Sequence, residues 1–168
     1  MSAATLVSVE EYLNSSYDPD RDYIDGVLLE RNWGERDHAD AQTALAAYVY
    51  NRRHQLGIHH NIEMRVQVSP TRFRVPDICV MLGPRPAELV YTHPPFLCIE
   101  ILSKDDTVES MQGRIDDYLR FGVRFVWLVN PRSRRGWIYT LEGMREATGG
   151  ILRTAEPEIT VPLAEILD

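Results

Sequence analysis

The chain has 168 residues, of which 44% are hydrophobic and 26% are charged, and we expect one domain, residues 1–168, with its own hydrophobic core. Its 25 acidic and 18 basic side chains give a formal net charge of -7, which argues against a protein that holds nucleic acid by bulk positive charge. The cysteines Cys79 and Cys98 are too few for a disulfide framework, so a reducing compartment is expected. Because the sequence shows neither a signal-peptide pattern nor a run of about 18 apolar residues, we expect a cytoplasmic protein that does not enter a membrane.

The first expected elements are a short helix, a hairpin and a long helix. Ser8 begins a capping-box pattern and predicts a short helix after it. Asp25-Gly26 between short apolar pieces predicts a hairpin turn, which places Glu30 near a strand end. Apolar residues recur at helical intervals over 35–56, and Gly57 predicts where this helix stops.

Three strand signals follow. Residues 62–68 alternate between apolar and polar, the pattern of a strand with one buried face. Residues 72–82 begin alternating and become apolar, with an interruption near Pro76, which cannot donate to a ladder. Residues 96–102 form an apolar run that carries one carboxylate, Glu100, and such runs are typical of strands covered on both faces.

The second half predicts another helix and further strands. Apolar residues at helical spacing indicate a helix over 108–119 that ends at Gly122. Residues 123–129 and 137–139 indicate two partner strands, and residues 162–167 a last short helix. This order predicts an α/β or α+β fold with helices packed on a single sheet.

Two carboxylates stand where a charge is costly. Glu100 lies inside an apolar strand, and Asp77 follows Pro76 at the start of the strand before it. A connecting loop of roughly 13 residues suits strands that lie side by side, so the two acids would converge. A divalent cation such as Mg²⁺ or Mn²⁺ would neutralise both. The alternative is that Asp77 caps a turn and Glu100 pairs with an arginine across the sheet.

These residues also carry a resemblance. Pro76-Asp77, followed by Glu100 within Cys98–Ser103, is similar to the active-site signature of the PD-(D/E)xK nuclease superfamily. The chain resembles more closely a large bacterial family of restriction-endonuclease-like proteins, formerly catalogued as a domain of unknown function. The matching stretches run over about residues 8–142 and are Tyr23–Gly26 with Glu30, His38, Arg74–Asp77, Ile99–Ser103, Tyr118 with Phe121–Val123, and Val126–Pro131.

The resemblance implies a restriction-endonuclease-like core, in which a mixed central sheet is flanked by helices and a Mg²⁺ site lies where the central strands part. Asp77 and Glu100 would be metal ligands, with the main-chain carbonyl of Ile101 as a third and Glu30 as a further one. His38 would lie at the rim and orient a ligand or a phosphate. The alternative for His38 is a solvated histidine at a helix start.

The chain departs from the superfamily signature at one position. The signature has lysine two residues after the strand acid, where this chain has Leu102. In the resembled family the basic group has moved to the next helix, at the position of Arg114. Arginine stays protonated, so it stabilises charge but hardly acts as a base. Lys104, just beyond the strand, could reach back into the site, or could be a solvated loop lysine.

The expected activity is therefore metal-dependent endonucleolytic hydrolysis of DNA, with catalytic roles for Asp77, Glu100, Arg114, Lys104 and His38. One alternative is a catalytically inactive nuclease-fold module for binding or assembly, motivated by Leu102 and the acidic net charge. Another is an enzyme that acts on a phosphoester outside nucleic acids. No organic cofactor is expected.

Further expectations concern partners. A homodimer is expected, because nucleases that cut both strands often pair two active sites by two-fold symmetry. Arg132, Arg134 and Arg135, together with Arg52-Arg53, either contact phosphates or form a solvated surface. Trp33 either stacks on a base or packs against the long helix.

Overall fold

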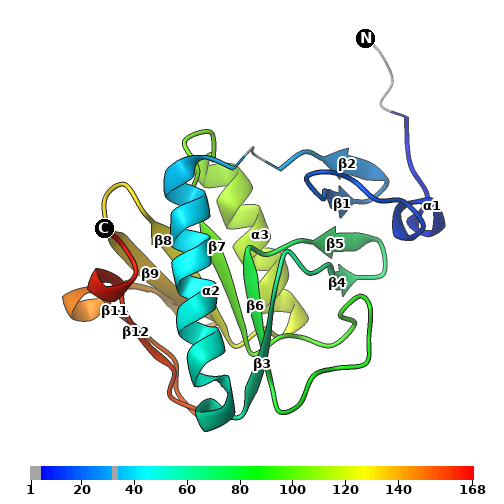
Figure 1. Ribbon diagram of the computed structural model, residues 1–168. Coiled ribbons are helices and arrows are strands. Elements are labelled where there is room, and N and C mark those ends of the chain that lie inside the picture. Colours follow the sequence, from blue (N-terminus) through cyan, green and yellow to red (C-terminus); the bar gives the residue numbers. More distant parts are fainter. Residues whose placement is uncertain (1–4, 32–33) are drawn as a thin grey trace.

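The computed structural model describes residues 5–31 and 34–168; the stacking or packing expected of Trp33 lies outside them. Two long helices, α2 (Arg36–Leu56) and α3 (Val108–Phe121), lie on either side of a six-stranded sheet, and a smaller sheet stands beside them (Figure 1). The mixed α+β class with helices flanking a sheet is confirmed. The expectation of a single sheet is wrong, because the strands form sheets of six, four and two members.

The six-stranded sheet is mixed. Its strands in spatial order are β10 (Gly143–Glu146), β9 (Arg135–Thr140), β8 (Phe125–Asn130), β7 (Leu97–Ile101), β6 (Ile78–Leu82) and β3 (Ile58–Ile62). β7 and β8 run parallel, and the other neighbours pair antiparallel. A parallel pair needs a crossover connection, and α3 provides it over one face of the sheet.

Both faces of the central strands are buried, as the unbroken apolar runs predict. Ile78 and Ile99 belong to a core on the side of α2, whose buried residues include Leu45. Their neighbours Cys79 and Cys98 belong to a second core that contains residues of α3. Successive strand residues point to opposite faces, so each run supplies both cores. Both cysteines are free and buried.

The smaller sheet holds the N-terminal elements. Its strands in spatial order are β2 (Val27–Leu29), β1 (Asp22–Ile24), β5 (Arg72–Arg74) and β4 (Val66–Ser69). Tyr12 of α1 (Val9–Leu13), Tyr23 and Phe73 form its core, and the ring centroids of Tyr12 and Tyr23 lie 5.0 Å apart. The chain passes between the two sheets three times: from β2 through α2 to β3, from β3 to β4, and from β5 to β6. The last of these joints positions the candidate site.

A third, two-stranded sheet completes the fold on the side of α2. β11 (Ile151–Arg153) pairs with β12 (Thr160–Pro162), and the short 3-10 helices η1 (Thr148–Gly150) and η2 (Leu163–Glu165) precede β11 and follow β12. A Cβ on Gly136 of β9 would lie 3.0 Å from Leu152 Cδ2, so glycine there permits the close approach of this hairpin. Among the described residues, no helix has the length and apolar character that a membrane span requires.

The caps predicted from the sequence are confirmed. The Ser8 side chain accepts from the N–H of Glu11, and α2 and α3 end at Gly57 and Gly122, both left-handed, with φ of 63° and 113°. The continuous strand predicted over 62–68 is wrong: it breaks after β3 at Glu63, whose φ is 50°.

Two other predicted elements also differ from the structure. The run over 72–82 is interrupted at Val75-Pro76, as predicted, but its two halves, β5 and β6, belong to different sheets. The last helix is shorter than predicted, since only residues 163–165 are helical.

Candidate active site

Asp77 lies at the joint between the small sheet and the large one. It immediately precedes β6, is buried, and its Oδ2 accepts a hydrogen bond of 2.7 Å from the main-chain N–H of Ile101 at the end of β7. The pairing of Ile78 with Ile99, continued by one residue, places Asp77 opposite Glu100. Opposite residues of an antiparallel pair share a face, so the two acids converge.

Glu100 is fully buried and is held from α3. The hydroxyl of Tyr118 donates to Glu100 Oε1 at 2.6 Å, and Arg114 Nη1 donates to Oε2 at 3.3 Å. Both helical residues lie on the face of α3 that packs against the sheet, four positions apart. Glu100 therefore pairs with an arginine, as in the alternative from the sequence, but the arginine comes from the covering helix.

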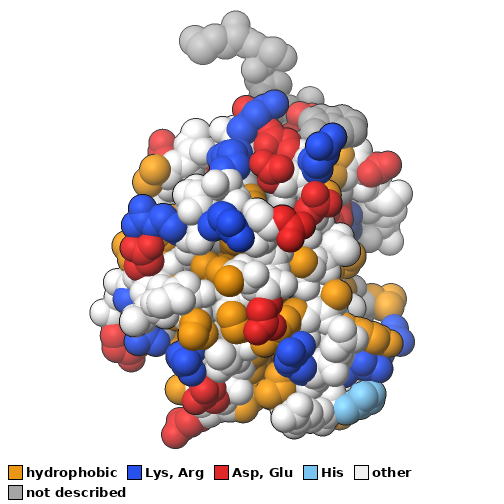
Figure 2. All heavy atoms as spheres, turned by 60° about the vertical axis from the view of Figure 1, so that its left-hand side comes forward, with side chains coloured by type: hydrophobic (Ala, Val, Ile, Leu, Met, Phe, Trp, Pro, Cys, Tyr) orange, Lys and Arg blue, Asp and Glu red, His pale blue; other side chains and the backbone are white. Residues whose placement is uncertain are grey.

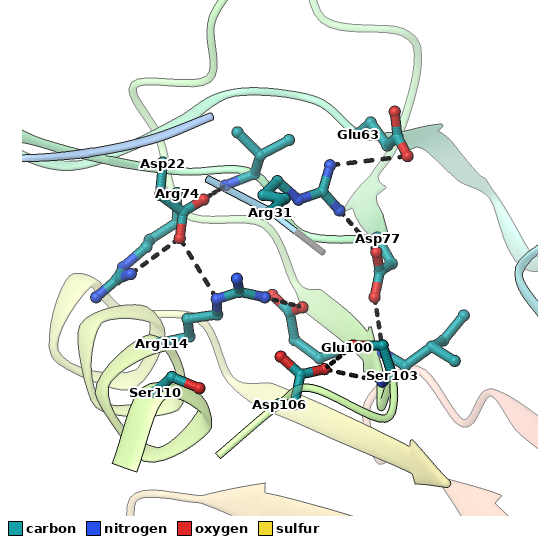
Figure 3. A network of polar contacts seen from close by, with 12 residues as sticks. Asp22, Arg31, Glu63, Arg74, Asp77, Glu100, Ser103, Asp106, Ser110 and Arg114 are labelled. Carbon is teal, nitrogen blue, oxygen red and sulfur yellow. Dashed lines mark hydrogen bonds and ion pairs between the residues drawn. The ribbon is translucent and has the colours of Figure 1, made fainter. Parts of the chain in front are cut away.

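Two further basic groups contact Asp77, Arg31 from the segment before α2 and His38 from the first turn of α2. Arg31 Nη2 donates to Asp77 Oδ1 at 2.7 Å, and His38 Nε2 lies 3.3 Å from the same oxygen. The side-chain amide of Gln42, one turn beyond His38, donates to the main-chain carbonyl of Asp77 at 3.1 Å. Figure 3 shows Asp77 and Glu100 close together, with Arg31 on one side and Arg114 on the other.

The two acids have pKa values shifted in opposite directions. Burial raises the pKa of Asp77, but the hydrogen bond from His38 and the charge of Arg31 outweigh it, so this pKa lies below its ordinary value. Burial raises the pKa of Glu100 to about 7, because Arg114 offsets only part of that cost and the charge of Asp77 adds to it. Near neutral pH the site therefore holds an ionised Asp77 beside a Glu100 that exchanges a proton.

The imidazole of His38, which contacts Asp77, also has a shifted pKa. Burial lowers the pKa of His38, but its hydrogen bond to Asp77 and the charge of that carboxylate raise it more, so the net pKa lies above the ordinary value. This contact, and its place beside the cavity, put His38 in the site and argue against the solvated alternative.

A second set of buried charges supports these residues. Asp22 Oδ2 accepts from Arg74 Nη1 at 2.9 Å and lies 3.4 Å from Arg114 Nε, while Asp22 Oδ1 accepts from the N–H of Val75 at 3.0 Å. Asp22 thus links the strand that leads to the joint with the guanidinium that reaches Glu100. The resemblance pointed to the hairpin that carries Asp22, but the sequence analysis selected Glu30 there and missed Asp22.

A cavity of about 100 Å³ opens beside Asp77. Its lining includes Arg31, His38, Asp77, the chain at Ile101 and Arg114. A second hollow of about 440 Å³, which includes Asp22 and Glu30 in its lining, adjoins it, and the two share Asp106 and Arg114. Asp77 is therefore buried but borders a space that a small group can enter, whereas Glu100 lies behind it and lines neither hollow.

Several predicted residues lie away from this centre. Glu30 has a side chain that is 77% exposed and pairs with Arg21 at 3.2 Å, and it lines the second hollow only. Lys104 is 67% exposed and lies 3.4 Å from Glu35, which also lies 3.6 Å from Arg132. Neither Glu30 nor Lys104 has a contact with the two buried acids in the described part of the chain.

The donor set fits one hard divalent cation. Two carboxylates and a main-chain oxygen are the ligands that Mg²⁺ accepts, and Mg²⁺ completes its shell with water. An ionised carboxylate offers about four acceptor positions, and Glu100 uses two of them, for Tyr118 and Arg114. In residues 5–31 and 34–168, no group of three or more His, Cys, Asp or Glu side chains is placed to hold an ion. An ion here would rest on Asp77 and Glu100 and would compete with the guanidinium groups that now neutralise them.

Comparison with known proteins shows the family and a solved structure of the same fold. The family model Uma2, described as "Putative restriction endonuclease", matches residues 9–165. A crystal structure described as "a putative nuclease belonging to DUF820 from Anabaena variabilis ATCC 29413" has the same fold, with a TM-score of 0.80 over 95% of this chain and 97% of that one, at 19% sequence identity. No curated protein matches.

Proposed function

The chain belongs to the Uma2 family, and from this premise we propose that it is a metal-dependent endonuclease that hydrolyses phosphodiester bonds in DNA. The observation that carries the proposal is that Asp77, just before β6, lies opposite Glu100 of β7, with both side chains buried and Asp77 lining a small cavity. Paired acids with divergent pKa values are typical of catalytic sites. Family membership supports the nuclease class, and the resemblance to PD-(D/E)xK enzymes supports the metal.

Asp77 and Glu100 would hold Mg²⁺ or Mn²⁺, with the carbonyl of Ile101 as a further ligand. When bound, such an ion polarises the phosphoryl oxygens and lowers the pKa of a water molecule. The Tyr118 hydroxyl holds one oxygen of Glu100, and the Ile101 N–H holds one oxygen of Asp77, so both carboxylates have a fixed orientation. Arg114 keeps a fixed positive charge beside the reacting phosphate and stabilises the charge that develops there.

Contacts to the DNA backbone would come from residues around the mouth of the site. Lys104 and Arg132 share Glu35 as a partner, and Arg132 also donates to the main-chain carbonyl of Ser103, which lines the cavity. On the face turned forward in Figure 2, basic and acidic side chains are interspersed. We propose a local backbone contact rather than a broad basic surface, together with a homodimer that presents two sites.

The test is cleavage of supercoiled and linear DNA in Mg²⁺, in Mn²⁺ and in chelator. Asp77→Asn and Glu100→Gln change one atom each and should each lower the cleavage rate at least about a hundredfold, as expected when a metal ligand is removed. Glu158→Gln is the matched control, because Glu158 is 67% exposed and pairs with Arg153 near β12. Cleavage by both site variants at the parent rate would show that these acids are not the ligands.

A second function follows from a specific observation. Asp77 and Glu100 each have a guanidinium partner, Arg31 and Arg114, and the signature lysine position holds Leu102. Acids that are neutralised by arginines need no metal ion, so the same arrangement also suits a nuclease-fold module that binds a partner without turnover. Calorimetric titration separates the two: a nuclease binds one divalent ion per site and loses it in Glu100→Gln, whereas a module binds its partner equally well in chelator.

A further inference from the structure

Arg31 is a buried cation with incomplete hydrogen bonding. Its side chain is 8% exposed, its Nη2 donates to Asp77, and its Nη1 lies 3.7 Å from Glu63 Oε1. Its Nε is buried and has no hydrogen-bond partner among the described residues. A buried donor without a partner is uncommon and costs free energy.

Arg74, a buried arginine nearby, shows what a purely structural guanidinium looks like here. It is held between two buried carboxylates, with 2.9 Å to Asp22 and 2.8 Å to Asp117. Arg31 has one buried carboxylate partner, and its second, Glu63, has a side chain that is 43% exposed. Arg31 is therefore the more easily moved of the two, and it lines the cavity.

We infer that Arg31 is the resident counter-ion of Asp77, that a divalent cation displaces it, and that the displaced guanidinium binds a phosphoryl oxygen of the nucleic acid. The inference rests on the proposed function, since it requires an ion at Asp77. Asp77 Oδ1 already has Arg31 at 2.7 Å and His38 at 3.3 Å, so a divalent ion at this oxygen would repel the Arg31 guanidinium and weaken its hydrogen bond. Arginine matches phosphate oxygens with its planar set of donors, and Nε adds one that is now unused.

The geometry gives the displaced side chain a destination. The cavity of about 100 Å³ lies between Arg31 and Arg114, with His38 on its wall. A phosphoryl group there would meet donors from three elements of the chain. Without an ion, the acids of the cavity oppose an anion, so phosphate binding should depend on the ion.

The experiment measures Mn²⁺ binding by calorimetry and by electron paramagnetic resonance, without DNA. Arg31→Gln should bind Mn²⁺ about tenfold more tightly than the parent, because a charge-assisted competitor is gone. The Mn²⁺-loaded variant should bind thymidine 5′-monophosphate at least about tenfold more weakly, because a bidentate donor is lost. Arg31→Lys, which keeps the charge, should bind Mn²⁺ with nearly the parent affinity. Arg124→Gln, at an exposed pair with Glu156, is the control and should change neither.

The two changes of opposite sign separate this role from a structural one. If Arg31 only stabilised the fold, Arg31→Gln would weaken both Mn²⁺ and nucleotide binding, and the inference would be overturned. If Arg31→Gln is too unstable for calorimetry, the nucleotide affinity of Arg31→Lys decides, and a parent-like value overturns the phosphate contact. If the parent and every Arg31 variant fail to bind Mn²⁺, the metal proposal itself fails, and this inference with it.

Discussion

Glu100→Gln tests the electrostatics of the site without DNA or metal. The pKa of Glu100 rises from 4.5 to about 7 on folding, because burial penalises its charge more than Arg114 and Tyr118 favour it. The folded chain therefore keeps a proton that the unfolded chain releases, and stability falls as pH rises from about 4.5 to about 7. A difference of this size corresponds to roughly 3 kcal/mol above pH 7.

Glutamine cannot ionise, so Glu100→Gln does not lose stability through this residue as the pH rises. The melting temperature of Glu100→Gln relative to the parent should therefore increase by about 8 °C between pH 5 and pH 8, since one kcal/mol shifts a domain of this length by about 3 °C. The assay is thermal unfolding followed by circular dichroism in chelator at several pH values. Asp77, Arg31 and Arg114 also face Glu100, but they keep their charges over this range. His38 interacts with Glu100 as well, but it is present in both proteins, so its own titration largely cancels in the difference. A melting difference that does not vary with pH would refute the raised pKa and leave an ordinary ion pair.

Three further changes probe neighbouring parts of the structure. Tyr118→Phe removes a hydrogen bond that favours the ionised carboxylate, so the pH at which Glu100 titrates, followed by nuclear magnetic resonance of a labelled side chain, should rise. Asp22→Asn leaves Arg74 with one buried partner fewer and should lower the free energy of unfolding by about 3–5 kcal/mol in urea denaturation. Leu45→Ala, in the core under α2, should cost about 2–5 kcal/mol and leave the titration of Glu100 unchanged, which separates fold from site.

Local sequence signals predicted the long elements because their causes are local. Ser8, Gly57 and Gly122 act within one helical turn, through a side-chain cap or a left-handed backbone. The break at Glu63 was missed because a glutamate with φ of 50° carries none of the glycine or proline signals of a turn. Alternation across residues 62–68 therefore looked like one strand, although the two ends belong to different sheets.

The two acids could be predicted because each is a charged residue in a segment that the sequence pattern marks as buried. A carboxylate within an apolar strand, and another after a proline at a strand start, are visible without knowledge of the fold. Asp22 and Arg31 gave no such signal, since both lie in polar stretches where exposure is the ordinary expectation. Their burial results from the packing of the small sheet against α3 and the joint at Asp77, which is a tertiary effect. Glu30 was predicted because the family resemblance has an acid at that position, and nothing in the sequence pointed to its neighbour Arg31.

The missing signature lysine removes less chemistry than the sequence suggests. A lysine at that position would supply a positive charge near the phosphate and a group that can exchange a proton. Arg114 supplies the charge from α3, at 3.3 Å from Glu100, but it stays protonated. Glu100 would stay ionised as a metal ligand, so proton exchange would fall to His38, whose pKa lies above its ordinary value. In the proposed site, the two roles of one lysine would therefore be divided between Arg114, as a fixed cation, and His38, as a titrating neighbour.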